Sequence, residues 1–393
     1  MRGIINRFGS AYRTRWDAVI VAVVFATVSW GSVQAADTNP QLDEIVEFTG
    51  QIVFLQQKVP ALVIGVVRND EFSVYGFGER AGEGSEAPDG NTLMRIGSIT
   101  KAFTGEVLAH LVADNLIELT QPITRSWPEL ADGAKNDVGN IRLIDLVTHS
   151  AGLQRELPRT PGRENDPTAT ITIKAISDWL KNEPLLTAPG KSILYSNVGF
   201  DVLAHGLSRA ASRPYPELLE SYITSPLSLK NTVFKLSAEQ EKRLMQGHGF
   251  DGAPLPNIPT GSVIVGSGGL YSTPNDLLNW MKWHLDRFST SGMEPRLLDH
   301  ALYLNRDGLD SVFGMDESGH MDAMGLGWVG MMPEGNRPFI LQKAGGLQGV
   351  FSYIAFAPAR GVGVFISINT YDFNAATAMA VAANELIATL APR

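Results

Sequence analysis

Runs of apolar residues near both ends of the chain have the length and composition of β-strands. Residues 61–68 (ALVIGVVR) and 72–77 (FSVYGF) are rich in β-branched and aromatic side chains. The short polar link Asn69-Asp70-Glu71 between them predicts a β-hairpin. Similar runs predict strands at residues 325–332, 350–356 and 361–368, and the glycine-rich stretch that starts at Lys343 is expected at a strand edge.

Hydrophobic residues spaced three or four apart predict helices in the middle of the chain and near its ends. The predicted ranges are 41–56, 143–147, 173–181, 198–211, 216–223, 275–285 and 374–390, together with a helix after residue 98. Because strands near both ends flank a helical middle, the simplest prediction is an α+β fold. One antiparallel sheet would be built from residues of about 41–100 and 325–393 and flanked by helices, with a mostly helical subdomain of about 105–285 inserted.

The first 35 residues have the pattern of a secretory signal peptide. Four arginines lie within the first fifteen residues, residues 18–30 form an apolar run, and Val33-Gln34-Ala35 offers small residues on either side of a glutamine at a cleavage site. We therefore expect cleavage after Ala35, a mature domain of residues 36–393 and a periplasmic location. The alternative is an uncleaved membrane anchor, although the apolar run is short for a bilayer span.

The composition limits both the partners and the chemistry. Residues 36–393 carry 28 basic and 40 acidic residues, a net charge of −12, which argues against nucleic acid or anionic lipid as a partner. The chain has no cysteine, so disulfides, a thiol nucleophile and thiolate metal sites are excluded. The seven histidines show no spacing typical of a metal site, and we expect neither a metal nor another cofactor.

The strongest chemical candidate is the pair Ser98-x-x-Lys101, which the pattern places in the first turn of a predicted amphipathic helix. Apolar residues follow the pair at helical spacing, at Phe103, Val107, Leu108, Leu111 and Val112. Positions i and i+3 share a helix face, so a partly desolvated lysine amine can remove the serine proton. The N–H groups at a helix start would also stabilise a developing oxyanion. Alone, however, Ser-x-x-Lys occurs by chance about once in a chain of this length.

Two further motifs, each weak by itself, strengthen this candidate. Tyr195-Ser196-Asn197 precedes a predicted helix, where the tyrosine can relay protons and the asparagine amide can fix a substrate carbonyl or amide group. Lys343-Ala344-Gly345-Gly346 combines a cation for a substrate carboxylate with glycines that allow close approach of a substrate backbone. The three motifs in this order are far more specific than any one of them.

In these motifs the chain resembles the serine β-lactamases and penicillin-binding proteins, and it is most similar to their class C branch. More narrowly, it resembles the AmpH-type D-alanyl-D-alanine carboxypeptidase/endopeptidases. The stretches that support this narrower resemblance are residues 266–274, 314–316, 322–328 and 342–346, whereas residues 148–153 are a hallmark of the wider class C branch. The resemblance covers essentially the whole chain after residue 35, and it implies the β-lactamase/transpeptidase-like form of the predicted α+β fold.

The resemblance also implies a role for each motif residue. Ser98 would be the acylated nucleophile, and Lys101 and Tyr195 would share the general base and acid work. The residues that would bind substrate are Asn197, Lys343 and Gly345.

The family resemblance also places the oxyanion hole, and it contains one departure. The backbone N–H groups of Ser98 and Gly346 would hold the oxyanion. Ala344 stands where the family usually has threonine, so a hydroxyl that could bind a substrate carboxylate is missing. The serine chemistry does not depend on that hydroxyl, but a strict preference for a free C-terminal carboxylate does.

The implied function is that of a periplasmic D-alanyl-D-alanine carboxypeptidase/endopeptidase that acts on peptidoglycan stem peptides and is acylated by β-lactams. A class C-like β-lactamase or a carboxylesterase of the same fold is the first alternative, because spacing shows neither the preferred substrate nor the rate of deacylation. A non-catalytic penicillin- or peptidoglycan-binding module is an alternative of another class, and the intact Ser98, Lys101 and Tyr195 argue against it. A monomer is expected, and peripheral contact with the membrane is left open.

Overall fold

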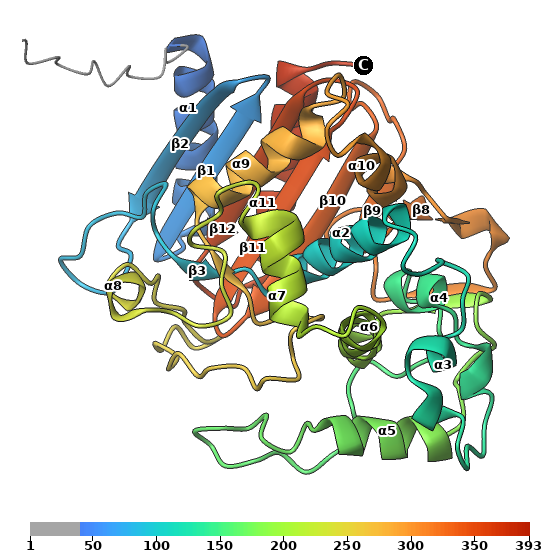
Figure 1. The fold of residues 1–393 in the computed structure, drawn as a ribbon. Coiled ribbons are helices and arrows are strands. Elements are labelled where there is room, and N and C mark those ends of the chain that lie inside the picture. Colours follow the sequence, from blue (N-terminus) through green and yellow to red (C-terminus); the bar gives the residue numbers. More distant parts are fainter. Residues whose placement is uncertain (1–39) are drawn as a thin grey trace, which may run out of the picture. The chain divides into compact units, whose positions relative to one another are not determined.

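The central element is an eight-stranded antiparallel sheet (Figure 1). The computed structural model describes residues 40–393, so the predicted signal peptide lies outside the described residues. The strands of this sheet are β1 (Ala61–Arg68), β2 (Glu71–Gly78), β6 (Leu304–Asn305), β8 (Ala323–Met324), β9 (Val329–Met331), β10 (Ile340–Leu347), β11 (Val350–Ala357) and β12 (Val362–Ile368). Their order is β2-β1-β12-β11-β10-β9-β8-β6, and all neighbours are antiparallel.

The sheet joins segments from both ends of the chain. Leu62 of β1 lies opposite Phe77 of β2 on one side and opposite Ile368 of β12 on the other. Nearly every residue of β1 and all of β12 are buried. The continuous apolar sequence of these strands is therefore explained by a sheet that is covered on both faces.

Two helices cover one face of the sheet. They are α1 (Pro40–Gln57) and α11 (Phe373–Leu390), which pack on β1, β2, β11 and β12 and on each other. By length and composition α11 could cross a membrane. One side of α11, which includes Met379, Ala383 and Ile387, is buried in the core on this face, whereas Phe373 and Val381 are exposed.

The other face carries the larger core and the helical middle of the chain. Its main helices are α2 (Thr100–Ala113), α6 (Asn197–Ala210) and α9 (Pro274–Leu285), and α9 lies directly across β1 and β12 (Figure 1). We predicted α2 to be amphipathic, and this is wrong, because residues 100–109 and Leu111 are all buried. Other helices, including α6 and α10 (Met293–His300), pack around α2 on the sides that do not face the sheet.

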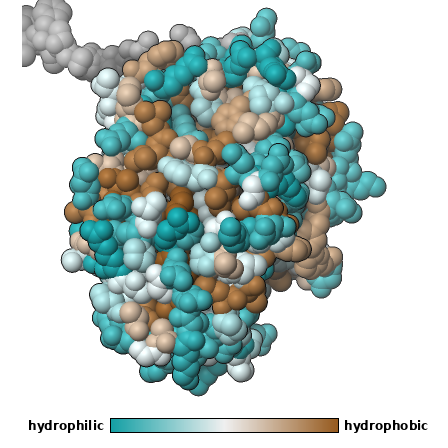
Figure 2. Space-filling model, turned by 90° about the vertical axis from the view of Figure 1, so that its right-hand side faces the viewer, coloured by the Kyte–Doolittle hydropathy of each residue, from teal (hydrophilic) through white to brown (hydrophobic). Residues whose placement is uncertain are grey.

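The remaining elements are short. The helices are α3 (Ile123–Ser126), α4 (Leu143–Val147), α5 (Ile173–Asn182), α7 (Tyr215–Leu219) and α8 (Ala238–Glu241). Two small sheets pair β3 (Met94–Arg95) with β5 (Tyr271–Ser272), and β4 (Ser192–Leu194) with β7 (Ser311–Phe313). On the face shown in Figure 2, hydrophobic side chains are interspersed with hydrophilic ones.

The structure confirms the predicted α+β fold with an antiparallel sheet flanked by helices. The long predicted helices and strands agree with the observed ones to within one or two residues at most ends. Helices α3, α8 and α10 were not predicted, and neither were the two-residue and three-residue strands apart from β9. The division into a sheet part and a helical subdomain stays a prediction.

Candidate active site

Ser98 and Lys101 lie where a short 3₁₀ turn, Gly97–Ile99, leads into α2. We predicted both residues in the first helical turn. Lys101 lies in the first turn of α2, whereas Ser98 lies in the 3₁₀ turn directly before it. Gly97, which begins that turn, has φ +50°, a left-handed conformation that favours glycine. The pair still meets as predicted, since Nζ of Lys101 donates a hydrogen bond to Oγ of Ser98 over 3.0 Å.

The amine of Lys101 has three oxygen partners. Besides Ser98, Nζ donates to Oδ1 of Asn197 (2.7 Å) and to the carbonyl oxygen of Ser267 (2.6 Å). Burial lowers the pKa of Lys101 to about 7, while the Asp201 carboxylate acts in the opposite direction. When the amine loses one proton, the amide and carbonyl oxygens can only accept hydrogen bonds, so they retain the two remaining N–H groups. The lone pair then faces Ser98, which suits a general base near neutral pH.

Tyr195 lies beside the same amine, directly after β4. Its ring centre is 5.0 Å from Nζ of Lys101 and 5.3 Å from Nζ of Lys343. Lys343 itself is buried and donates to the carbonyl of Ala344 over 2.8 Å. Burial lowers the pKa of Lys343, as does the nearby Lys101, while Tyr195 raises it. The tyrosine ring thus lies beside both amines of the site.

The glycines of β10 let this strand pack directly against the turn that holds Ser98. A Cβ on Gly345 would lie 2.8 Å from the backbone nitrogen of Ser98, and closer still to the carbonyl oxygen of Ile96. A Cβ on Gly97 would lie 2.7 Å from the backbone nitrogen of Gly346. We predicted that these glycines make room for a substrate backbone. At Gly345 the missing side chain makes room for the protein's own backbone, and the two predicted oxyanion amides become neighbours.

A cavity of about 460 Å³ opens over this arrangement. Its lining includes the motif residues Ser98, Tyr195, Lys343, Ala344, Gly345 and Gly346. Apolar side chains form much of the remaining wall, namely Met315, Val329, Phe351, Phe373 and Met379. Arg155 and Glu317 add one charge of each sign, and the Arg155 guanidinium lies 4.7 Å from the centre of the Tyr195 ring. The three motifs therefore meet at one cavity large enough for a peptide segment.

Several residues of the site were not found from the sequence. Asp201 of α6 accepts hydrogen bonds from the Gly266–Ser267 segment, whose carbonyl holds Lys101. The side-chain amide of Asn197 donates to the carboxylate of Glu156, so both ends of this amide already have protein partners. Of these residues, only Asp201 could have been noticed in the sequence, because it is an acidic residue within the apolar run of a predicted helix.

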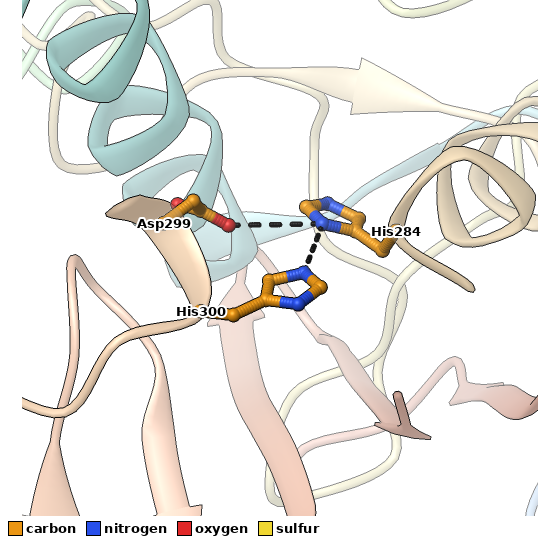
Figure 3. Close-up of side chains that lie close together, drawn as sticks. All are labelled: His284, Asp299 and His300. Carbon is orange, nitrogen blue, oxygen red and sulfur yellow. Dashed lines mark hydrogen bonds and ion pairs between the residues drawn. The ribbon is translucent and has the colours of Figure 1, made fainter. Parts of the chain in front are cut away.

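Among residues 40–393, one cluster outside this site has the side chains of a metal centre (Figure 3). It comprises His284, Asp299 and His300, whose ligand atoms lie within 4.8 Å of one another. Nδ1 of His284 and Nε2 of His300 are 2.9 Å apart, and their ring planes differ by only 28°. A tetrahedral zinc ion would hold two nitrogens about 3.3 Å apart, with both lone pairs on the ion. The spacing instead fits a direct N–H···N bond.

This cluster is better described as part of a buried polar network beside α2. Trp328 donates to Asp299 (2.8 Å), and Trp280 donates to Glu106 of α2 (2.6 Å). Burial raises the pKa of Asp299 well above its usual value, with a further contribution from Glu106. The network therefore links α2 to α9 and α10 in the core.

The chain is similar in sequence to known proteins. The family model described as Beta-lactamase matches residues 34–388. The chain is 31% identical to the D-alanyl-D-alanine-carboxypeptidase/endopeptidase AmpH of Escherichia coli, over 95% of this chain and 96% of the relative. It is 25% identical to a beta-lactamase of Pseudomonas fluorescens, over 83% and 93% of the two chains.

Solved structures show the same fold. The crystal structure of a beta-lactamase/D-alanine carboxypeptidase from Yersinia pestis, complexed with citrate, superposes with a TM-score of 0.79 at 34% identity. That match covers 89% of this chain and 99% of the other. A class C beta-lactamase superposes with a TM-score of 0.76 at 18% identity, covering 89% and 98%.

Proposed function

The chain belongs to the β-lactamase family of serine hydrolases, and from this premise we propose that it is a D-alanyl-D-alanine carboxypeptidase/endopeptidase acting on peptidoglycan stem peptides. The observation that carries the proposal is the contact between the buried amine of Lys101 and Oγ of Ser98, at the floor of the cavity. A buried amine with a pKa near neutrality can activate a serine that is open to substrate.

The proposed reaction proceeds through an acyl-enzyme. Neutral Lys101 takes the proton of Ser98 as Oγ attacks the carbonyl carbon of the D-alanyl bond. The carbonyl oxygen becomes an oxyanion beside the backbone N–H groups of Ser98 and Gly346. When the C–N bond breaks, Tyr195 and Lys101 return a proton to the leaving amine, and D-alanine departs. Water then hydrolyses the ester by the reverse sequence of proton transfers.

Substrate binding is assigned to the remaining motif residues. Lys343 supplies positive charge at the cavity wall for a carboxylate. The side-chain N–H group of Asn197 binds the substrate amide after it has left the carboxylate of Glu156. With Ala344 at the position of a threonine, a free terminal carboxylate loses one hydroxyl partner. This favours a mixed activity in which internal cross-links, which lack that carboxylate, are also cleaved.

The setting that we propose is the periplasm. The basic and apolar pattern of residues 1–35 supports export by a signal peptide. The net charge of −12 for residues 36–393 is compatible with a monomeric enzyme that has no affinity for nucleic acid.

Digestion of purified muropeptides tests this function. The mature chain should release D-alanine from a pentapeptide and convert a cross-linked dimer into monomers, whereas Ser98→Ala should do neither at an unchanged melting temperature. Rapid hydrolysis of penicillin with untouched muropeptides would instead identify a β-lactamase. Cleavage of simple esters alone would identify a carboxylesterase, and tight binding without any turnover would identify a binding module.

A further inference from the structure

Helix α6 carries a second polar residue one turn after Asn197. Asp201 lies four positions further on, so the two share a face of the helix, and only 6% of Asp201 is exposed. Its Oδ1 accepts the backbone N–H groups of Gly266 (3.2 Å) and Ser267 (3.0 Å), and its Oδ2 accepts the hydroxyl of Ser267 (3.0 Å). One carboxylate therefore fixes the backbone and the side chain of this loop.

The same loop faces the catalytic amine. The carbonyl oxygen of Ser267 accepts a hydrogen bond from Nζ of Lys101 over 2.6 Å. Two of the three partners of Lys101 thus depend on α6, since Asn197 contacts the amine directly and Ser267 is held by Asp201. If the Ser267 carbonyl moved, the neutral amine would lose an acceptor and could rotate its lone pair away from Ser98.

We propose that Asp201 is a positioning residue for acylation of Ser98: it fixes the Gly266–Ser267 segment so that the Ser267 carbonyl orients the amine of Lys101, and it supplies the buried countercharge of that amine. The inference rests on the proposed function, because it takes Lys101 as the general base. It adds a residue that lines no part of the cavity and lies in none of the three sequence motifs.

The charge of Asp201 has a predictable effect on the pH dependence. Burial lowers the pKa of Lys101, and the carboxylate of Asp201 is the strongest of the charges that raise it. Burial also raises the pKa of Asp201 to about 7, so the carboxyl and the amine titrate in the same pH range. Where Asp201 is ionised its charge favours the protonated amine, so without that charge the pKa of Lys101 falls further and the neutral amine persists to lower pH. The groups that face Lys101 are Asp201 from α6, Glu156 and Arg155 from the loop after α4, Lys343 from β10, and the rings of Tyr195 and His149.

Three substitutions separate the two contributions of Asp201. Asp201→Asn removes the charge but keeps an oxygen for the backbone N–H groups and a donor for the Ser267 hydroxyl. Asp201→Ala removes the charge and also the hydrogen bonds to the Gly266–Ser267 segment. Asp276→Asn is the matched control, because Asp276 is equally buried, at 6% exposure, and binds Asn231 and Thr232 instead.

The experiment measures the rate of penicillin acylation from pH 5 to pH 9 by intact-protein mass spectrometry. For Asp201→Asn we expect the midpoint of the acid limb to move down by about one pH unit, with a plateau rate within about threefold of the wild type. For Asp201→Ala we expect a plateau rate lower by ~10–100-fold. Asp276→Asn should leave the midpoint in place.

Two results would overturn the inference and are distinguishable. If Asp201→Asn folds and its midpoint does not move, or moves upward, Asp201 has only a structural role and the proposed function is unaffected. If the wild type forms no adduct at any pH, the proposed function itself fails, and the inference fails with it. The asparagine variant decides the question even if Asp201→Ala does not fold.

Discussion

Replacing Gly345 by alanine should damage catalysis much more than folding. The new Cβ would lie 2.8 Å from the nitrogen of Ser98 and 2.9 Å from that of Ile99, and closer still to the oxygen of Ile96. All three are backbone atoms, so no side chain can turn away. Ordinary contact requires β10 and the Ser98 turn to separate by about 1 Å. The cost of such overpacking is about 1–3 kcal/mol of unfolding free energy.

The catalytic loss follows from the same separation. The backbone N–H groups of Ser98 and Gly346 sit on the two sides of this contact, and an oxyanion needs both within about 2.7–3.1 Å. Moving one of them out of range should lower the acylation rate by ~10²–10³-fold. Thermal melts and penicillin acylation at pH 7 measure the two effects. Gly139→Ala is the control, because its Cβ meets nothing within 4 Å. A folded Gly345→Ala variant that acylates at the wild-type rate would refute the reasoning.

Two further substitutions probe substrate choice and the buried network. Ala344→Thr should restore a hydroxyl in the cavity. We expect it to raise the ratio of pentapeptide cleavage to cross-linked dimer cleavage by ~3–10-fold, which corresponds to about one hydrogen bond. An unchanged ratio would show that residue 344 does not contact the carboxylate. Because the pKa of Asp299 is raised in the folded protein, its protonated form contributes to the free energy of unfolding at low pH. This contribution is lost as the pH rises through the pKa of Asp299 in the folded state. Asp299→Asn keeps an acceptor for Trp328, so it should raise the melting temperature at pH 8 more than at pH 5; an equal change at both would contradict the assignment.

The sequence predicted well those helices and strands whose buried residues are apolar and close together in the chain. Strands β1, β11 and β12 are almost entirely apolar runs, and they were found although Ser352 lies within β11 and Ser367 within β12. Helix α10 was missed because its buried residues are Pro295, Arg296 and Asp299, which carry no apolar period. Their burial depends on partners from distant segments, such as Trp328 for Asp299.

In the active site, too, the features that are local in sequence were predicted and those that depend on distant segments were not. The three motifs could be found because each is a short, fixed spacing, and the structure brings them to one cavity. Asp201 and Ser267 are separated by more than sixty residues, and only the fold places the Ser267 carbonyl against Lys101. The amphipathic pattern predicted for α2 was wrong for a related reason. Glu106 on that helix looks solvent-facing in sequence, yet it is buried against the indole of Trp280.

Intact-protein mass spectrometry of the mature chain with penicillin, and separately with a muropeptide pentapeptide, examines the acyl-enzyme itself. We expect a lasting mass increase of one penicillin that maps to the peptide containing Ser98, together with loss of D-alanine from the pentapeptide. Ser98→Ala should show neither. A penicillin adduct that persists in Ser98→Ala, or no adduct and no turnover in the wild type, would contradict a serine peptidase built on Ser98 and Lys101.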